Sequence, residues 1–218
     1  MSKNWKMVYD DLAKNNSDEI SQSGYVIDGK PLEEKVFYNW FKNIQKEFKV
    51  EPIHSFVDVG CGSGIFLKFF SKYSNNLFGV DSSEYQLMSA NKNYPEAKFE
   101  INNAMNFDFG GVLFDRVFCN SVFLLFDNLD YAEKVLINFE KRTKKGGKIW
   151  IGDIPEVNEL VDNKYRRIGK SVDLPFQHYP ESFFANFCLE RNLKGRKIAQ
   201  KIKGKESAKY RYDFIIEK

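Results

Sequence analysis

The sequence is poor in the residues that build disulfides, metal sites and membrane spans. It holds three cysteines, none of them in a Cys-x-x-Cys pair, and only two histidines. Scattered cysteines argue against a disulfide framework or a zinc site and are typical of reduced thiols in a cytoplasmic protein. No apolar run approaches the length of a membrane span, and the polar N-terminus lacks an apolar signal segment. We therefore predict a cytoplasmic protein without a bound metal.

Neither sign of charge is in large excess, since the formal net charge is +3. That excess is too small to indicate a nucleic-acid-binding protein by itself. Basic residues do gather between Arg191 and Arg211, against the single acid Glu206. One interpretation is the solvated face of edge strands, where lysine discourages aggregation. The other is attraction of an anionic small molecule.

Hydrophobic residues, by contrast, are abundant, at 43% of the chain with 21 phenylalanines among 218 residues. This composition predicts a packed interior in one domain. Apolar spacing and turn residues predict strands over residues 53–59, 77–80, 98–101, 114–120, 148–152, 196–201 and 209–217, and helices over residues 33–48, 65–73, 84–93, 131–144 and 180–192. The alternation predicts a mostly parallel α/β sheet, closed by an antiparallel C-terminal hairpin because its last connection is short.

The most informative segment is residues 56–64, an apolar strand that ends near Asp58 and opens into alternating glycines. A turn from a strand into a helix offers backbone N–H groups and a positive dipole end to a ligand. Ile65 stands where a Gly-x-Gly-x-x-Gly dinucleotide fingerprint needs its third glycine, which argues against a nicotinamide-dependent oxidoreductase. No lysine precedes Lys68, so the turn is not a P-loop either.

Val57–Gly64, with the sequence Val-Asp-Val-Gly-Cys-Gly-Ser-Gly, resembles motif I of the class I S-adenosylmethionine-dependent methyltransferases residue for residue. The resemblance implies a Rossmann-like seven-stranded sheet with helices on both faces, S-adenosyl-L-methionine as cofactor and S-adenosyl-L-homocysteine as product. In this family the glycine turn is expected to hold the methionine part through backbone amides. The residues concerned are Asp58, Gly60, Cys61, Gly62 and Gly64.

A second landmark is Asp81, which ends the short apolar strand after motif I. An acid at the end of the second strand of a doubly wound sheet accepts hydrogen bonds from ribose hydroxyls. We therefore expect Asp81 to bind the ribose of the cofactor, with Ser82 as a further polar contact. A role for Asp81 in capping the following helix is compatible with this prediction.

Further cofactor contacts are expected after the third and fourth strands. Asn103, Ala104 and Met105 occupy the place where the family usually has an adenine-binding residue, although that residue is usually aspartate. Asn120 and Ser121 end the strand that, in the family, runs beneath the reacting sulfonium. Enzymes that methylate exocyclic amines of bases often carry a proline pair after this asparagine; its absence here weakens a nucleic-acid base as the acceptor.

The N-terminal segment resembles the part of related enzymes that folds over the cofactor. The resemblance rests on the stretch that begins at Tyr9, which we include among the cofactor-binding residues. We therefore divide the chain into a cap segment, residues 1–32, and a methyltransferase domain, residues 33–218.

Candidate catalytic residues are His178, its neighbour Tyr179 and Asp153. His178 stands in an aromatic-rich loop before the last helix, which in the family lies on the acceptor side. A histidine of near-neutral pKa can remove a proton from a hydroxyl; the alternative is a loop histidine packed on its aromatic neighbours. Asp153 and the tyrosines Tyr9 and Tyr25 are further candidate bases. Methyl transfer from a sulfonium depends mainly on alignment, so a missing catalytic dyad does not exclude an enzyme.

The predicted function is methyl transfer to a small polar acceptor at an oxygen atom. At the level of the family, a sugar or phosphate-bearing precursor of a surface polysaccharide is an expected acceptor. The alternatives are an RNA or protein methyltransferase that uses the basic C-terminal face, and a non-catalytic module that binds S-adenosylmethionine. We expect a monomer or homodimer that binds neither membranes nor nucleic acid.

Overall fold

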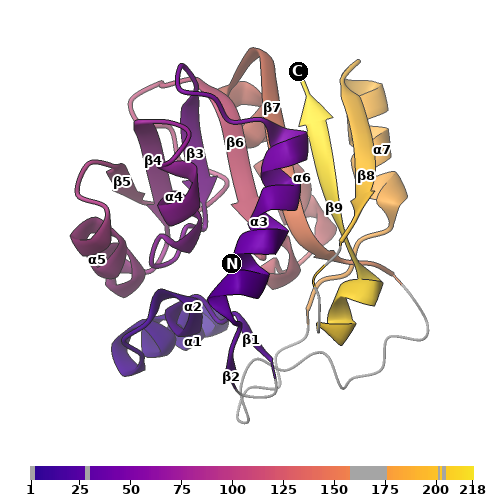
Figure 1. The fold of residues 1–218 in the computed structure, drawn as a ribbon. Helices are drawn as coiled ribbons and strands as arrows, with labels where there is room; N and C mark the ends of the chain where they lie inside the picture. The colour runs from indigo at the N-terminus through magenta and orange to yellow at the C-terminus, as the bar shows by residue number, and fades with distance from the viewer. Residues whose placement is uncertain (1–2, 28–29, 158–175, 201, 203–204) are drawn as a thin grey trace.

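A seven-stranded sheet with the order β5-β4-β3-β6-β7-β9-β8 runs through the middle of the molecule (Figure 1). The computed structural model describes residues 3–27, 30–157, 176–200, 202 and 205–218. Within this sheet, β3 to β7 pair in parallel, and β9 is antiparallel to both its neighbours. The strands are β3 (Ser55–Val59), β4 (Asn76–Asp81), β5 (Lys98–Ile101), β6 (Phe114–Asn120), β7 (Thr143–Pro155), β8 (Lys194–Ala199) and β9 (Arg211–Glu217).

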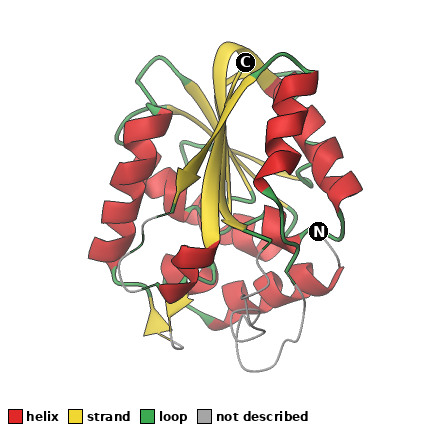
Figure 2. Ribbon diagram, turned by 90° about the vertical axis from the view of Figure 1, so that its right-hand side faces the viewer, coloured by secondary structure: helices red, strands yellow, loops and turns green. Residues whose placement is uncertain are grey.

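Helices cover both faces of the sheet, as the view along it in Figure 2 shows. They are α1 (Lys3–Asn15), α2 (Glu19–Gln22), α3 (Glu34–Phe48), α4 (Ile65–Phe70), α5 (Glu84–Asn93), α6 (Leu129–Arg142) and α7 (Glu181–Glu190). Two 3-10 turns, η1 (Phe123–Leu125) and η3 (Glu206–Tyr210), and a small antiparallel pair, β1 (Val26–Ile27) with β2 (Lys30–Pro31), complete the described elements. The predicted fold class is confirmed. None of the described helices is both long and apolar enough to cross a bilayer.

The core lies in two layers, because successive residues of a strand point to opposite faces of the sheet. On β3, Val57 packs with the layer beneath α6 and α7, whereas Phe56 packs with the layer beneath α3 and α4. The second layer is strongly aromatic: Phe41 meets Phe70 edge-on at 4.9 Å between ring centroids. Each fully buried phenylalanine contributes about 1.5–3 kcal/mol, so these rings fix the sheet firmly.

The predicted boundary between the helix at residues 131–144 and the strand after it is wrong. Helix α6 ends at Arg142, and β7 begins at Thr143, so the basic stretch before Gly146 lies in a strand rather than at a helix end. Thr143 is extended, its hydroxyl donates to the carbonyl of Phe139, and its Cα pairs with Phe114 of β6. Pairing with β6 therefore overrides the local stop signal. The N-terminal helices α1 and α2 had no counterpart in the sequence prediction.

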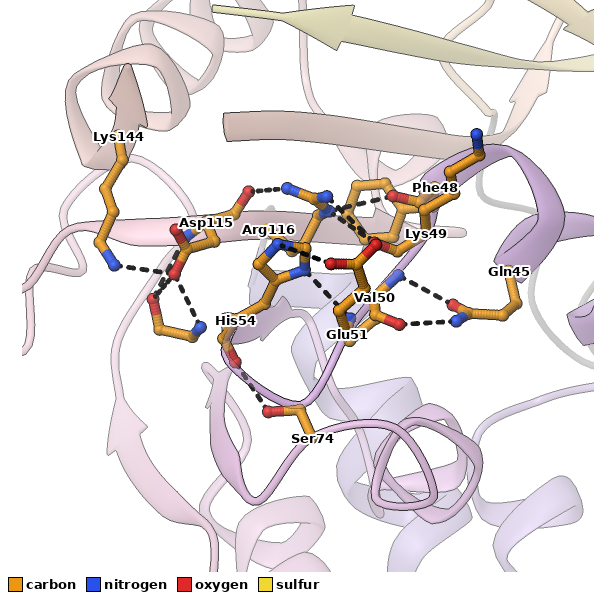
Figure 3. Close-up of polar contacts among 11 residues, drawn as sticks. Gln45, Phe48, Lys49, Val50, Glu51, His54, Ser74, Asp115, Arg116 and Lys144 are labelled. Atoms are coloured by element: carbon orange, nitrogen blue, oxygen red, sulfur yellow. Dashed lines mark hydrogen bonds and ion pairs between the residues drawn. The ribbon is translucent and has the colours of Figure 1, made fainter. Parts of the chain in front are cut away.

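Polar side chains tie together the amino ends of three strands, far from the ends that carry motif I (Figure 3). Asp115, near the start of β6, accepts hydrogen bonds from the backbone N–H and hydroxyl of Ser55 at 2.8 Å each and pairs with Lys144 at 2.7 Å. The buried Arg116 donates to the carbonyls of Phe48 and Lys49 at the end of α3. A cation is stabilised at the negative dipole end of a helix. Arg116 therefore fastens the start of β6 to the end of α3.

Candidate active site

A cavity opens at the carboxyl ends of β3, β4, β5 and β6. This is the point where strand order reverses, between β3 and β6, and open α/β sheets bind their ligands there. The cavity holds about 720 Å³ of space between atoms, part of it open to solvent, which suits a small molecule. Its lining residues are Tyr9, Ser23, Tyr25, Gly60, Cys61, Gly62, Ile65, Phe66, Val80, Asp81, Ser82, Asn102, Asn103, Ala104, Asn120, Ser121, Val122, Leu125, Phe126 and Tyr131.

The glycine turn forms the floor of this cavity, but its amides are used within the protein. The N–H groups of Gly60 and Cys61 both donate to the carbonyl of Val80, at 2.7 and 3.0 Å. The N–H of Gly62 donates to Oδ2 of Asp81 at 2.9 Å. The expectation that these amides hold the methionine part is therefore not supported, because β3 and β4 already occupy them. The carbonyl oxygen of Gly60 is not the acceptor in any of these three hydrogen bonds.

The glycines of the turn leave little room for side chains, as Gly62 and Gly64 show. Gly62 has φ +54°, and a Cβ there would meet the hydroxyl of Ser23 at 3.2 Å. Gly64 has φ +94°, and a Cβ there would meet the ring of Tyr94 at 2.7 Å. Gly64 does not line the cavity among the described residues; its lack of a side chain lets α4 start against α5.

Asp81 connects the glycine turn to the start of α5. Its second oxygen, Oδ1, accepts from the backbone N–H of Ser83 at 2.8 Å. Burial raises the pKa of Asp81, although hydrogen bonds from the backbone of Ser83 and Gly62 oppose that rise. A carboxylate has more lone pairs than these two bonds use, so Asp81 can still accept from hydroxyl groups in the cavity.

Asp58 lies on β3 between Gly79 of β4 and Phe118 of β6, just before the turn. It does not line the cavity, but its Oδ2 is buried without a hydrogen-bond partner in the described part of the chain. Burial first, and then the nearby Asp81, raise the pKa of Asp58 well above its usual value. A cationic partner would stabilise the ionised form of such a buried, unpartnered carboxyl.

After β5, the lining consists of Asn102, Asn103 and Ala104, whereas Met105 is absent from it. The Oδ1 of Asn103 accepts from the backbone N–H of Met105 at 3.0 Å, and the Oδ1 of Asn102 accepts from the N–H of Asn103 at 2.8 Å. These local bonds set the shape of the loop. Asn102 was missed by the sequence analysis, although its position directly after a strand is the same signal that singled out Asp81.

At the end of β6, polar groups join three distant parts of the chain. Nδ2 of Asn120 donates to the hydroxyl of Tyr25 at 2.9 Å and lies 3.0 Å from Oγ of Ser121. Oγ of Ser121 donates to Oδ2 of Asp153 at 2.7 Å. Burial raises the pKa of Tyr25 well above its usual value. Tyr25, from the N-terminal segment, is therefore a neutral phenol in the wall of the cavity.

Asp153, at the end of β7, is held as an anion. Burial by itself would raise the pKa of Asp153, but Arg211 at 2.7 Å and Lys205 at 3.2 Å hold it far below its usual value. A carboxylate stabilised in this way is a weak proton acceptor, and Asp153 does not line the cavity among the described residues. Its position does not favour the predicted role as a base.

The other two candidate catalytic residues also stand outside the described cavity lining. Tyr179 is fully buried, and its hydroxyl donates to the carbonyl of Phe123 at 2.8 Å. Nδ1 of His178 lies 3.0 Å from the carbonyl of Phe176. These contacts favour packing roles for both side chains over proton transfer in the cavity.

The N-terminal segment is fastened to α5 beside the cavity. Nε2 of the buried Gln86 donates to the carbonyls of Tyr9 and Gln22, at 3.0 and 2.7 Å. The hydroxyl of Ser83 donates to Asp10. Figure 1 shows α1 and α2 at the lower end of the sheet, where β6 ends. The sequence analysis named Tyr9 and Tyr25 in this segment but missed Ser23, because a lone serine in a polar stretch carries no pattern.

Other missed lining residues are apolar or aromatic: Ile65, Phe66, Val80, Val122, Leu125, Phe126 and Tyr131. Phe66 belongs to the apolar stripe of α4, and apolar periodicity alone does not separate a core residue from a cavity wall. Leu125 lies in η1, Phe126 directly after it, and Tyr131 in the first turn of α6, all beyond β6. Only the return of the chain over the sheet brings them to the cavity.

Comparison with known families matches part of the chain to a methyltransferase domain. Residues 57–151 match the sequence model of a family described as "Methyltransferase domain". This stretch of the chain is therefore similar to that methyltransferase family. The predictions of the family and of a methyltransferase are confirmed for these residues, and the predicted cofactor agrees with the ligands named for two of the structures described next. A search of curated protein sequences gave no match to this methyltransferase.

Solved structures share the fold of the methyltransferase at low identity. Phosphoethanolamine N-methyltransferase 1 of Haemonchus contortus superimposes with a TM-score of 0.77 at 13% identity over 98% of this chain, which spans only 48% of that enzyme. CalS10, an amino pentose methyltransferase of Micromonospora echinaspora, gives 0.70 at 14% identity, over 93% of this chain and 98% of its own. The N-methyltransferase NodS of Bradyrhizobium japonicum, with S-adenosylhomocysteine, gives 0.69 at 14%, over 96% and 97%.

The cavity of the methyltransferase fits such a cofactor chemically. Oδ2 of Asp58, just before the glycine turn, is buried without a partner in the described part of the chain, and a positively charged amine bound at the turn would stabilise its ionised form. Asp81 retains acceptor capacity for hydroxyls. Apolar side chains, among them Phe66, Leu125 and Phe126, make up much of the remaining wall, which suits a flat ring.

Proposed function

We propose that this methyltransferase transfers a methyl group from S-adenosyl-L-methionine to a small polar acceptor, at a hydroxyl oxygen. The observation that carries the proposal is a cavity that joins motif I, Asp81 and the end of β6 under one N-terminal segment. The cofactor, when bound, supplies a methyl group already activated on a sulfonium. The protein then has to bind, align and desolvate the acceptor.

Each part of the cavity has a role in this proposal. Asp81 would hold the ribose hydroxyls, and Asp58 with the carbonyl of Gly60 would receive the amino group of the methionine part. Asn102 and Asn103 would border the adenine. These assignments use the ends of β3, β4 and β5, so the acceptor must lie towards the end of β6.

Tyr25 and Asn120 would orient the acceptor at that end. The hydroxyl of Tyr25 is hydrogen-bonded to the side chains of Asn120 and Ser121, which fixes the phenol at the end of β6, where it would meet the acceptor. Because burial keeps Tyr25 neutral at ordinary pH, we assign it an orienting rather than a basic role. Removal of water from the acceptor by the apolar wall would raise its reactivity.

An amine nitrogen is the second candidate acceptor atom. Two of the structural neighbours are named as N-methyltransferases and a third as an amino pentose methyltransferase. An amine needs the same alignment, and loses its proton more readily than an alcohol when it is placed in an apolar cavity. Sugars, amino sugars and phosphate-bearing precursors of surface polysaccharides are the compounds to test first.

The experiment is calorimetry with S-adenosylhomocysteine, followed by turnover with pairs of acceptors that differ only in carrying a hydroxyl or an amine. Binding of the product with turnover of one member of a pair supports the proposal and assigns the atom. Binding without turnover of any small acceptor favours the non-catalytic module, and turnover confined to RNA or protein favours those substrates. No binding to folded protein would contradict the proposal.

A cytoplasmic location belongs to the same proposal. The cysteines Cys61, Cys119 and Cys188 are all buried free thiols in the structure, which suits a reducing compartment. Thiol titration of protein purified without reductant, before and after unfolding, tests this. Three titratable thiols that become reactive only on unfolding are the expected result.

A further inference from the structure

We infer that Arg211 and Lys205 form an anion subsite that binds a phosphate group of the acceptor, next to the methyl-transfer cavity. The inference rests on the proposed function, since it names the class of acceptor: a small molecule that carries a phosphate monoester. It is argued from the hydrogen bonds, the charge balance and the connection of these two side chains to the cavity wall.

Both cations are nearly buried, and each has N–H donors that bond to no described residue. The side chain of Arg211 is 10% exposed and that of Lys205 is 17% exposed. Arg211 uses only Nη1 in its hydrogen bonds to described residues, both of them to Asp153. Nζ of Lys205 makes one such bond, again to Asp153. A guanidinium has five N–H donors and an ammonium three, so most of the donors at this spot remain for another acceptor.

The charges at this spot do not balance. Asp153 supplies one firm negative charge against the two cations. The second carboxyl, Asp213, is buried, and burial raises the pKa of Asp213 to about 7 although the backbone N–H of Asp153 donates to it. Burial, opposed by Asp153 and assisted by Arg211, lowers the pKa of Lys205. Buried cations in excess over anions are costly, and a bound phosphate would supply the missing charge.

These cations differ from the other basic residues near the C-terminus. Arg196 on β8 pairs with Glu47 at 2.6 Å, and Lys197 pairs with Glu156 and Glu181. Those pairs fit a solvated edge strand, which was one of the two interpretations of the basic run. Arg211 and Lys205 are the members of the run for which the second interpretation, an anionic small molecule, is the better one.

The subsite adjoins the cavity through two of its lining residues. Oγ of Ser121 donates to Asp153 at 2.7 Å, so the cation cluster lies directly behind the end of β6. Burial first, then Asp81 and Asp153, raise the pKa of Tyr9, and Arg211 opposes them, which places Tyr9 within the field of the cluster. An acceptor between Ser121 and Tyr9 would have its reactive atom at the cavity and its phosphate at Arg211.

The test uses the full chain saturated with S-adenosylhomocysteine, titrated calorimetrically with inorganic phosphate, glycerol phosphate, glycerol, and sugar phosphates with their parent sugars. We expect the phosphorylated compounds to bind and their parents to bind about tenfold or more weakly. Arg211→Gln and Lys205→Gln should each weaken phosphate binding by about tenfold or more, since each removes a charge-assisted contact. Lys209→Gln, the same change at an exposed residue of η3, should leave it within about twofold.

Asp153→Asn provides a variant with the opposite expected sign. It removes the internal competitor for both cations, so it should tighten binding of glycerol phosphate severalfold, whereas a purely structural role of Asp153 predicts only weaker binding. This variant also decides the matter if Arg211→Gln fails to fold. A thermal melt of each variant verifies its folded state.

Equal affinity for phosphorylated and parent compounds, or unchanged phosphate affinity in folded Arg211→Gln, would overturn the subsite. Weaker phosphate binding in folded Asp153→Asn would also overturn it. All of these results leave binding of S-adenosylhomocysteine untouched, and so leave the proposed methyl transfer standing. Loss of S-adenosylhomocysteine binding in the unsubstituted protein would instead count against the proposed function.

Discussion

At the scale of single residues, Asp81 combines an observed role in the glycine turn with a proposed role in ligand binding. One oxygen accepts from the N–H of Gly62 in the glycine turn and the other from the N–H of Ser83 at the start of α5. The carboxylate therefore shapes the turn before any ligand arrives. Its remaining lone pairs are the part that sequence reasoning assigned to the ribose, and both tasks require the ionised form.

Asp81→Asn should weaken binding of S-adenosylhomocysteine by about 1–3 kcal/mol, because an amide can accept only with one of its two terminal atoms. Calorimetry measures the loss. Asp130→Asn, which changes an exposed acid of α6, is the control and should bind as the unsubstituted protein does. Equal affinity of the two variants would remove Asp81 from the ribose site.

At the scale of elements, the two ends of the sheet have different tasks. At the amino ends of β3, β6 and β7, side chains bond to each other and to backbone, as around Asp115 and Arg116 in Figure 3. At the carboxyl ends, polar atoms are left over, as at Asp58. A rigid base holds the strands in register, so the ends that bind the ligand need little reorganisation.

The ion pair of Asp115 should appear in the pH dependence of stability. Burial alone would raise the pKa of Asp115, but hydrogen bonds from Lys144 and Ser55 lower it from 3.8 to about 2. Because the folded pKa lies below the unfolded one, this stabilisation is complete above about pH 4 and is lost as the pH falls through about 2.

Urea unfolding of the unsubstituted protein and of Asp115→Asn over this pH range measures the effect. The unsubstituted protein should have the larger free energy of unfolding at neutral pH, and the gap should shrink as the pH falls towards 2. Glu133→Gln, at an exposed position of α6, should show no such shrinking gap. A gap for Asp115→Asn that stays constant with pH would refute the assignment.

At the scale of the whole molecule, the N-terminal segment completes the cavity. Tyr9, Ser23 and Tyr25 line it, and they come from a part of the chain that packs against α5. At the outer side, Trp5 of α1 stacks on Phe176, with ring centroids 5.4 Å apart. The division into a cap, residues 1–32, and a domain, residues 33–218, remains a prediction, and the contacts of the cap suggest how to test it.

Gln86→Ala should loosen the cap, because the buried amide of Gln86 donates to the carbonyls of both Tyr9 and Gln22. We expect faster hydrogen exchange in α1 and α2 and weaker binding of S-adenosylhomocysteine by about threefold or more, with exchange in the central strands unchanged. Asn91→Ala, at an exposed position of the same helix, is the matched control. Unaltered exchange in α1 would show that Gln86 does not hold the cap.

The sequence by itself determined the elements with strong local signals. The alternation of β-strands with amphipathic helices, the glycine turn after Asp58 and the acid Asp81 at a strand end are all visible along the chain, because periodicity and turn chemistry are local properties. The limits of the helix at residues 84–93 and of the strands at residues 98–101 and 114–120 were therefore predicted correctly. Where a tertiary contact competed, as at Thr143, the local signal failed.

Only the tertiary structure decided which polar groups meet. Tyr25, Asn120 and Ser121 form one network, and Asp153 joins it to Arg211 from β9. The hydroxyl of Tyr179, in contrast, donates to the carbonyl of Phe123 in the core. The residues of the network lie far apart along the chain, and the free energy of a buried charge depends on neighbours that folding alone supplies. For that reason the predicted cofactor residues followed from a motif, whereas the network at the end of β6 depended on how the sheet brings its strand ends together.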